Sequence, residues 1–430
     1  MAALCKVSFP MYCCEFVDDK TFFVGGGGGA AKTGVRNCVQ VFELEKQRKG
    51  FHAQPIDQLE TDKHAIMHMS AKTVTNDTSK GQSKCMLALS MGSQCNVYTV
   101  SGSQKPAAET DKSDSTVKRR KKSDSKSKKE KEPSQAVTHY SFNLEHEIDS
   151  VPGKGGFQTS VQISNSGSLI VAGGSDGHLR AWKLTGNKVH EKVFNVHGHK
   201  DDVTDLDISL DDKQIVSASR DAKAYLWDSS NGHKLLDLSS IWNMQMVTRA
   251  YRFRNCKFAI VPEDSSRFML FTSHAPIKQD VTKKSSHACC LTKWAKRKTK
   301  EGLFVGDLKP AIMQHTGSEA ISSMAVSKNG VFVGVGFMDG SVAIYIAFSL
   351  QCAKRVKNIH SIFVTSVSFV HDSPQMEKEC DAALVSVSAD CTCKLTKLDS
   401  RALFPYWVVI VLCFVAIACS ALYLHSVGVI

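Results

Sequence analysis

Five consecutive glycines followed by Lys-Thr form the stretch of this sequence whose residue types come nearest to a chemical site. The stretch runs from Gly25 to Gly34 and continues to Asn37. It invites comparison with a phosphate-binding loop, in which a glycine-rich turn ends in Gly-Lys-Ser/Thr and opens a helix. Here Ala31 stands where the last glycine should be, and the residues after Asn37 alternate like a strand. The sequence therefore does not favour a nucleotide site at this stretch.

Two interpretations of the glycine stretch remain open. Glycine has no Cβ, so the backbone can bend sharply there or approach another group closely. The stretch is either a flexible hairpin without a role, or a backbone-rich loop that binds a cation through carbonyl oxygens or a partner through close approach. Because it contains almost no apolar side chains, we expect an exposed loop. Alanine in place of Gly26, Gly27 or Gly28 is then expected to change thermal stability little.

The cysteines are the other residues with the capacity for chemistry. Fifteen of them occur at irregular spacings without a Cys-x-x-Cys pair, which favours reduced thiols in a cytosolic environment. Cys391-x-Cys393 comes closest to a metal pair, but it lies in a strand-like run, where packing is the simpler role. The sequence contains neither a recognisable catalytic triad nor a convincing metal site.

A repeated pattern indicates the elements that position these residues. Asp176 lies six residues before Trp182, and Asp221 lies six residues before Trp227, 45 residues further on. The same frame recurs at Asp339 and, degraded, at Asp390, and apolar strand-like runs precede each turn. Strand, turn, strand, Asp-turn, strand at a spacing of about 40–45 residues is the pattern of WD40 propeller blades.

The number of repeats predicts an all-β fold, a seven-bladed WD40-type β-propeller. We place two blades in residues 1–100, with the glycine-rich loop 25–37 in the first, and five blades in residues 137–400. A single blade cannot bury both faces of its sheet, whereas a closed ring can.

Residues 101–136 separate the two groups of blades and carry much of the basic charge. The chain has a formal net charge of +12, and eleven Lys or Arg residues lie between Lys105 and Lys131 without apolar periodicity. The run Lys118–Lys122 resembles a nuclear-import signal or a nucleic-acid patch, and basic runs are also drawn to anionic lipids. A disordered, solvated insertion is the interpretation that we favour.

Near the C-terminus, residues 402–424 form a stretch of 23 residues without a charge. As a helix it would reach about 34 Å, more than the ~30 Å hydrocarbon core of a bilayer. The sequence thus predicts one transmembrane α-helix followed by a short lumenal tail, residues 425–430. Lys394, Lys397 and Arg401 precede the stretch, so the positive-inside rule predicts a cytosolic propeller. The shortness of the span suits the endoplasmic reticulum (ER) membrane.

Several of these motifs together resemble a known family, the ER-anchored guanine-nucleotide exchange factors of the Sar GTPase (the prolactin regulatory element-binding protein family). The resemblance rests on the motif at 26–37 (GGGGAAKTGVRN), on the blade at 173–182, on the run at 340–352, and on the C-terminal anchor. It covers nearly the whole chain except residues 101–136.

The resemblance implies a guanine-nucleotide exchange factor that releases GDP from Sar at the ER and so starts COPII coat assembly for ER-to-Golgi protein transport. It also implies that the glycine loop contacts the GTPase and binds a potassium ion, through the backbone of Gly26, Gly27 and Gly28 and the side chain of Asn37. The expected contact residues are Gly25, Gly26, Gly27, Gly28, Gly29, Ala30, Ala31, Lys32, Thr33, Gly34 and Asn37. The alternatives are a passive ER-anchored WD-repeat scaffold and a DNA-binding transcriptional regulator. A membrane anchor argues against a nucleic-acid partner.

Overall fold

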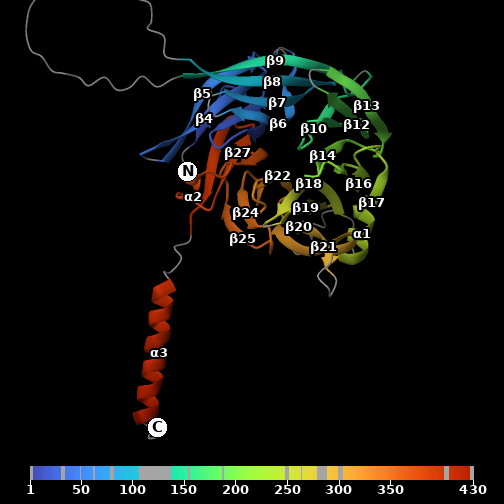
Figure 1. The fold of residues 1–430 in the computed structure, drawn as a ribbon. Coiled ribbons are helices and arrows are strands. Elements are labelled where there is room, and N and C mark those ends of the chain that lie inside the picture. Colours follow the sequence, from blue (N-terminus) through green and yellow to red (C-terminus); the bar gives the residue numbers. More distant parts are fainter. Residues whose placement is uncertain are drawn as a thin grey trace, which may run out of the picture.

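In the computed structural model the chain forms a ring of blades (Figure 1). The structure describes residues 3–30, 34–48, 50–61, 63–77, 82–105, 137–153, 155–185, 188–246, 251–262, 264–277, 288–298, 304–400 and 406–426. The described strands make seven antiparallel sheets of four strands each. The prediction of a seven-bladed β-propeller is therefore confirmed.

Each blade is a run of consecutive strands, with one exception at the point of closure. Blades 1 to 3 consist of β2 (Met11–Phe16), β3 (Thr21–Gly26), β4 (Cys38–Gln47) and β5 (Gly50–Glu60); β6 (Ile66–Asp77), β7 (Gln82–Met91), β8 (Gln94–Lys105) and β9 (Val137–Asp149); and β10 (Gln158–Ile163), β11 (Leu169–Gly174), β12 (His178–Thr185) and β13 (Lys188–His197).

Blades 4 to 6 follow the same order. They consist of β14 (Val203–Ile208), β15 (Gln214–Ser219), β16 (Ala224–Asp228) and β17 (Lys234–Asp237); β18 (Tyr251–Val261), β19 (Asp264–Pro276), β20 (Cys289–Lys298) and β21 (Phe304–Gly317); and β22 (Ile321–Val326), β23 (Phe332–Phe337), β24 (Val342–Ile346) and β25 (Cys352–Val356).

Blade 7 joins the two ends of the ring. Its strands β26 (Val364–Phe369), β27 (Ala382–Ser388) and β28 (Thr392–Leu398) come from the end of the propeller sequence, and its fourth strand is β1 (Cys5–Lys6). Cys5 pairs with Cys393, and Lys6 pairs with Thr392. This strand could not be predicted from the sequence, because two residues carry no periodicity.

Three helices complete the described structure: α1 (Leu238–Met246), α2 (Pro374–Glu377) and α3 (Tyr406–Ser426). In α1 the indole of Trp242 is fully buried, donates to Thr292 Oγ1 over 2.9 Å and stacks on His274. Within the described residues no helix is long and apolar enough to cross a membrane. Part of the range 402–424 lies outside the described residues, so the span stays a prediction.

The strand order gives the ring two distinct faces. Because successive strands of a blade are antiparallel, the turn between the second and third strands lies at the same end as the links between blades. We call this end the loop face, and the opposite end the far face. The glycine stretch between β3 and β4 is on the loop face, as are the four Asp-turns that the sequence repeats indicated.

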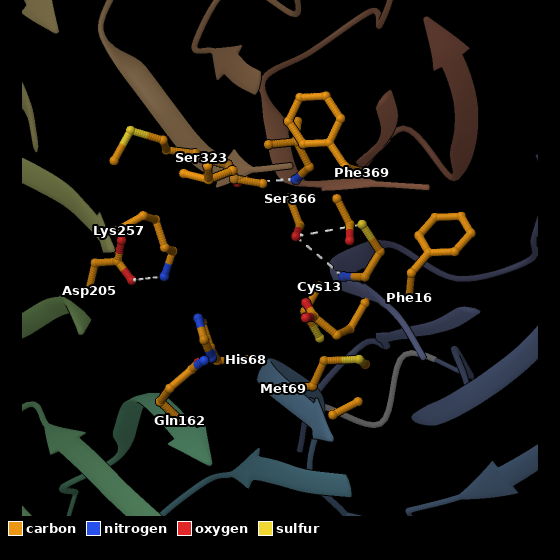
Figure 2. A pocket seen from close by; sticks show the side chains of 18 of the residues that line it. Cys13, Phe16, His68, Met69, Gln162, Asp205, Lys257, Ser323, Ser366 and Phe369 are labelled. Atoms are coloured by element: carbon orange, nitrogen blue, oxygen red, sulfur yellow. Dashed lines mark hydrogen bonds and ion pairs between the residues drawn. The ribbon is translucent and has the colours of Figure 1, made fainter. Parts of the chain in front are cut away.

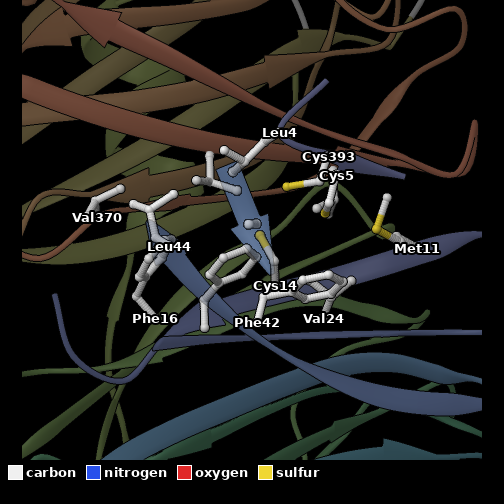
Figure 3. Packing of buried hydrophobic residues seen from close by; sticks show 14 of the residues in the cluster. Leu4, Cys5, Met11, Cys14, Phe16, Val24, Phe42, Leu44, Val370 and Cys393 are labelled. Atoms are coloured by element: carbon white, nitrogen blue, oxygen red, sulfur yellow. The ribbon is translucent and has the colours of Figure 1, made fainter. Parts of the chain in front are cut away.

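The apolar core is divided among the seven contacts between neighbouring blades. Each contact holds its own cluster of buried side chains. Figure 3 shows the cluster between blades 7 and 1, in which Cys393 and Cys5 of the closing strands lie with Met11, Val24 and other buried residues of blade 1. Both faces of every sheet are covered in this way.

One blade carries a complete hydrogen-bonded tetrad. His199 Nδ1 lies 3.2 Å from Asp221 Oδ2, and His199 Nε2 lies 2.8 Å from Ser217 Oγ. Trp227 Nε1–H donates to the same hydroxyl over 2.8 Å. Burial opposes ionisation of Asp221, but the bonds from His199 and from the Lys200 backbone outweigh it and hold the pKa of Asp221 below its ordinary value. The tetrad ties the Asp-turn of blade 4 to the preceding link.

The second blade differs from the expected boundaries. Its fourth strand, β9, begins at Val137, beyond the insertion, and its third strand, β8, continues to Lys105. The blade therefore extends to Asp149, and residues 101–105 belong to a strand instead of to the insertion. The insertion enters between the two outer strands, where a turn can be lengthened without disturbing the ring. Residues 106–136, which we expected to be disordered, lie outside the described residues.

We predict that Ser217→Ala lowers the free energy of unfolding by about 2 kcal/mol, because the buried Trp227 Nε1–H and the buried His199 Nε2 both lose their partner. Chemical denaturation monitored by tryptophan fluorescence measures this change. Ser230→Ala, in an exposed turn of the same blade, is the matched control and should change stability by less than about 0.5 kcal/mol. Equal effects of the two substitutions would contradict the structural role of the tetrad.

Candidate functional site

The glycine stretch begins inside a strand. Gly25 and Gly26 are the last two residues of β3, and both are buried. Gly26 pairs with Met11 on one side and with Cys38 on the other. The loop therefore starts at Gly27, and the expectation that it starts at Gly25 has to be corrected.

Steric crowding explains why the end of β3 consists of glycine. A Cβ atom on Gly25 would come within 2.7 Å of the Met69 side chain, and one on Gly26 would come within 2.0 Å of the Pro10 carbonyl oxygen. Gly27 has a φ of +138°, and a Cβ there would meet Asn37 Oδ1 at 2.2 Å. The expectation that alanine is tolerated at Gly26 and Gly27 is therefore wrong, because these positions belong to the packed blade.

Asn37 closes the loop from the other side. Its side chain is 6% exposed, its Oδ1 accepts from Gly29 N–H over 2.8 Å, and its Nδ2 donates to Gly29 O over 3.1 Å. The paired amide bonds hold the two limbs of the loop together just above the sheet. Asn37 is therefore part of the site, and its side-chain amide bonds to Gly29 of the same loop.

Backbone groups from two neighbouring links fix the base of the loop. Gly27 N–H donates to Pro10 O over 3.0 Å, and Thr61 N–H donates to Asn37 O over 3.0 Å. Sequence reasoning missed Pro10 and Thr61, because the contribution of each is a backbone atom and nothing in the residue type signals it. The base of the loop is therefore fixed to the ring.

The remaining predicted residues form the outer part of the loop. Gly28 and Ala30 are described, and Gly34 has a φ of +77° with open space around it. Ala31, Lys32 and Thr33 lie outside the described residues. The structure therefore brings Gly25–Gly29 and Asn37 together at one point of the loop face and leaves the contact role of the outer loop a prediction.

A central channel of about 620 Å³ lies inside the ring. It is lined by the first strands of the seven blades (Figure 2). Lys257 Nζ lies 2.9 Å from Asp205 Oδ1 across adjacent first strands, and burial raises the pKa of Glu15 to about 7. Of the channel carboxylates, Asp205 therefore lies beside an opposite charge, and Glu15 is partly neutralised at neutral pH.

The thiols in the channel wall are poor candidates for chemistry. Burial raises the pKa of Cys14 to about 12 and raises that of Cys13 as well, so both stay protonated at neutral pH. Neither thiol has a charged partner that would activate it in the way a nucleophile requires. The channel is a structural feature of the ring, and the glycine loop is the more distinctive site.

The described residues contain no group of three or more His, Cys, Asp or Glu side chains placed as metal ligands. Cys391 lies in the turn before β28, with a φ of +62°, and only Cys393 is in the strand. The expectation that the pair lies in a strand is therefore wrong for Cys391. Cys393 is fully buried in the cluster between blades 7 and 1, in agreement with the packing role.

Comparisons with known proteins agree with the fold and cover almost the whole chain. Residues 146–183 and 190–228 match the family WD domain, G-beta repeat. The guanine nucleotide-exchange factor SEC12 of Rattus norvegicus is 30% identical over 98% of this chain and 97% of its own length, and SEC12 of Mus musculus gives the same values. SEC12-like protein 2 of Arabidopsis thaliana is 24% identical over 57% of this chain and 53% of its own.

We predict that Gly26→Ala destabilises the propeller by about 3 kcal/mol, because the added methyl group overlaps the Pro10 carbonyl. Gly29→Ala is the matched control from the same loop. A Cβ at Gly29 meets nothing within 4 Å, so only the strain of its φ of +73° remains, about 1 kcal/mol. Denaturant unfolding of the two variants checks this difference, and equal losses would mean that the two glycines have the same role.

Proposed function

Because this chain belongs to the family of the SEC12 guanine nucleotide-exchange factors, we propose that it releases GDP from a small GTPase of the Sar type. It is a guanine nucleotide-exchange factor, a regulator of a GTPase that catalyses no chemical reaction of its own. The observation that carries the proposal is the 30% identity to two SEC12 proteins along 98% of the chain.

Exchange requires binding energy and no chemical group. A factor that binds the nucleotide-free GTPase more tightly than the GDP-bound form shifts the equilibrium toward release, by as much as the two affinities differ. Binding costs less when the contacting segment is ordered beforehand. The Asn37–Gly29 amide pair and the Gly27–Pro10 bond provide such order at the base of the glycine loop.

The proposed contact is this glycine loop, from Gly27 to Asn37, with Lys32 and Thr33 as its side-chain contacts. The loop extends the turn between the second and third strands, so it belongs to the loop face of the ring. Glycine-rich backbone presents N–H and C=O groups without side chains in the way, which suits close approach to a nucleotide-binding pocket. Gly25 and Gly26 support the loop from inside the blade.

A potassium ion is a further part of the proposal. Carbonyl oxygens can replace the hydration shell of potassium, and the proposed ligands are those of Gly26, at the end of β3, and of Gly27 and Gly28, at the start of the loop. A carbonyl or amide oxygen has two lone pairs, so Asn37 Oδ1 can accept from Gly29 N–H and still face a cation. The ion would add order and positive charge to the loop.

The ER membrane is the proposed place of action. The proposal rests on the sequence: residues 402–424 contain no charged side chain, and as one continuous helix they would reach about 34 Å, more than the ~30 Å hydrocarbon core. Lys394 and Lys397 lie on the propeller side of this helix, which favours a cytosolic propeller. Exchange there would start COPII coat assembly for ER-to-Golgi transport.

We predict that Lys32→Ala combined with Thr33→Ala lowers kcat/KM for GDP release from a Sar GTPase by about tenfold or more, equivalent to about 1.4 kcal/mol of lost stabilisation. The full chain in detergent is mixed with GTPase carrying fluorescent GDP, and the release rate is measured. Lys213→Ala, an exposed lysine in a turn on the far face, is the control and should retain activity. Full activity in the double variant would move the functional surface to another part of the ring.

We further predict that release is slower in sodium chloride than in potassium chloride of equal ionic strength, because the smaller sodium ion fits a potassium-sized carbonyl cage poorly. The spontaneous GDP release of the GTPase in the two salts is measured separately and subtracted. Equal stimulated rates in both salts would remove potassium from the proposal while leaving the exchange activity in place.

A further inference from the structure

Three large apolar side chains are exposed on the loop face, near the place where the ring closes. Met338, Ile362 and Phe363 are 43%, 41% and 39% exposed. Met338 lies in the turn between β23 and β24, and the other two lie in the link between β25 and β26. We call these three residues the apolar rim. Scattered exposed apolar residues need no explanation, but a group held in one place does.

Close backbone packing holds the two parts of the rim together. Gly340, in the turn that contains Met338, is so near the link that a Cβ on it would lie 2.6 Å from Ile362 O. His360 N–H donates to Gly340 O over 3.0 Å. The position of Met338 is thus fixed relative to Ile362 and Phe363.

Hydrogen bonds continue from the rim to the glycine loop. Ser361 N–H donates to Asp390 Oδ2 in the Asp-turn of blade 7 over 2.9 Å. From the other side of that turn, Cys391 O accepts from Val7 N–H over 3.1 Å. The link that begins at Val7 ends at Pro10, whose carbonyl accepts from Gly27 N–H.

A second connection runs along the inner strands. Thr365 Oγ1–H, two residues after Phe363, donates to Met11 O over 2.8 Å, and Met11 pairs with Gly26. The apolar rim and the base of the glycine loop are therefore parts of one hydrogen-bonded surface across blades 6, 7 and 1.

We propose that the apolar rim is a second docking contact for the GTPase, and that it takes an apolar surface of the GDP-bound form. This inference rests on the exchange function proposed above. The switch segments of a small GTPase are ordered by contacts to the γ-phosphate and are released in the GDP state, so apolar side chains there become available to a partner. A rim fixed by backbone bonds loses little freedom on binding.

The proposal gives the glycine loop and the apolar rim different roles. The glycine loop acts on nucleotide release, and the rim holds the GTPase in place while this happens. Uniform binding of this kind changes KM and leaves kcat unchanged. A loss of rim contacts should therefore have a kinetic signature different from that of the loop variants.

The test compares Met338→Asp and Ile362→Asp with Phe348→Asp in the full chain in detergent. Phe348 is 80% exposed in the turn between β24 and β25, on the far face, so it is a matched apolar-to-charged control. GDP release from a Sar GTPase is measured over a range of GTPase concentrations, together with Tm. Each rim variant is expected to raise KM by about tenfold, the size of a moderate interface contact, with kcat and Tm unchanged. The control variant is expected to behave like the wild type.

Three results would overturn the proposal: an unchanged KM in the rim variants, an equal rise in KM for Phe348→Asp, or loss of self-association of the chain in the rim variants with GTPase binding intact. The third result would make a second copy of the chain the occupant of the rim. If Ile362→Asp lowers Tm, the KM of Met338→Asp alone is compared with that of the control. If the wild-type chain itself does not release GDP, the exchange function is refuted. That result differs from the three above, in all of which the wild-type chain is active.

Discussion

Closure of the ring is the constraint on which the rest of the structure depends. Each sheet carries apolar side chains on both faces, and every blade buries them only by packing between two neighbours. The two-residue strand β1 completes the last sheet by pairing with β28, so a small element joins Cys5 at the start of the chain to Cys393 near its end. The paired residues Cys5 and Cys393 are both buried in the cluster between blades 7 and 1, so this pairing completes the last of the seven contacts between blades.

The glycine loop is a variation on a feature that recurs around the ring. Four blades close the turn between their second and third strands with an aspartate that bonds to nearby backbone, as Asp221 and Asp390 do. Blade 1 has no such aspartate. Its longer turn is closed instead by Asn37, whose amide bonds to Gly29, while the glycines of β3 allow the neighbouring link to pass close by. A turn that serves packing in the other blades is thereby lengthened into a candidate contact surface.

The sequence contained enough to predict the number of blades and the location of the candidate loop. The Asp–Trp frame and the apolar runs are local patterns, and local patterns can be read from one chain. It did not reveal β1, β9 beyond the insertion, or the burial of Trp242 in α1, because each depends on a partner distant in sequence. For the same reason the sequence did not show that Gly25 and Gly26 belong to strand β3, whereas the loop starts at Gly27. Gly26 and Gly29 look alike in sequence, and only the Pro10 carbonyl beside Gly26 separates a packed position from an open one.

The direction of β28 gives the molecule an orientation. This strand starts at the Asp-turn of blade 7 on the loop face and runs to Leu398 on the far face. The chain that leads on to α3 therefore leaves the propeller from the side opposite the glycine loop. Strands β8 and β9, which flank the basic insertion, also have their connection on that side. The far face thus carries the ends that lead to α3 and to the insertion, whereas the loop face carries the glycine loop and the Asp-turns.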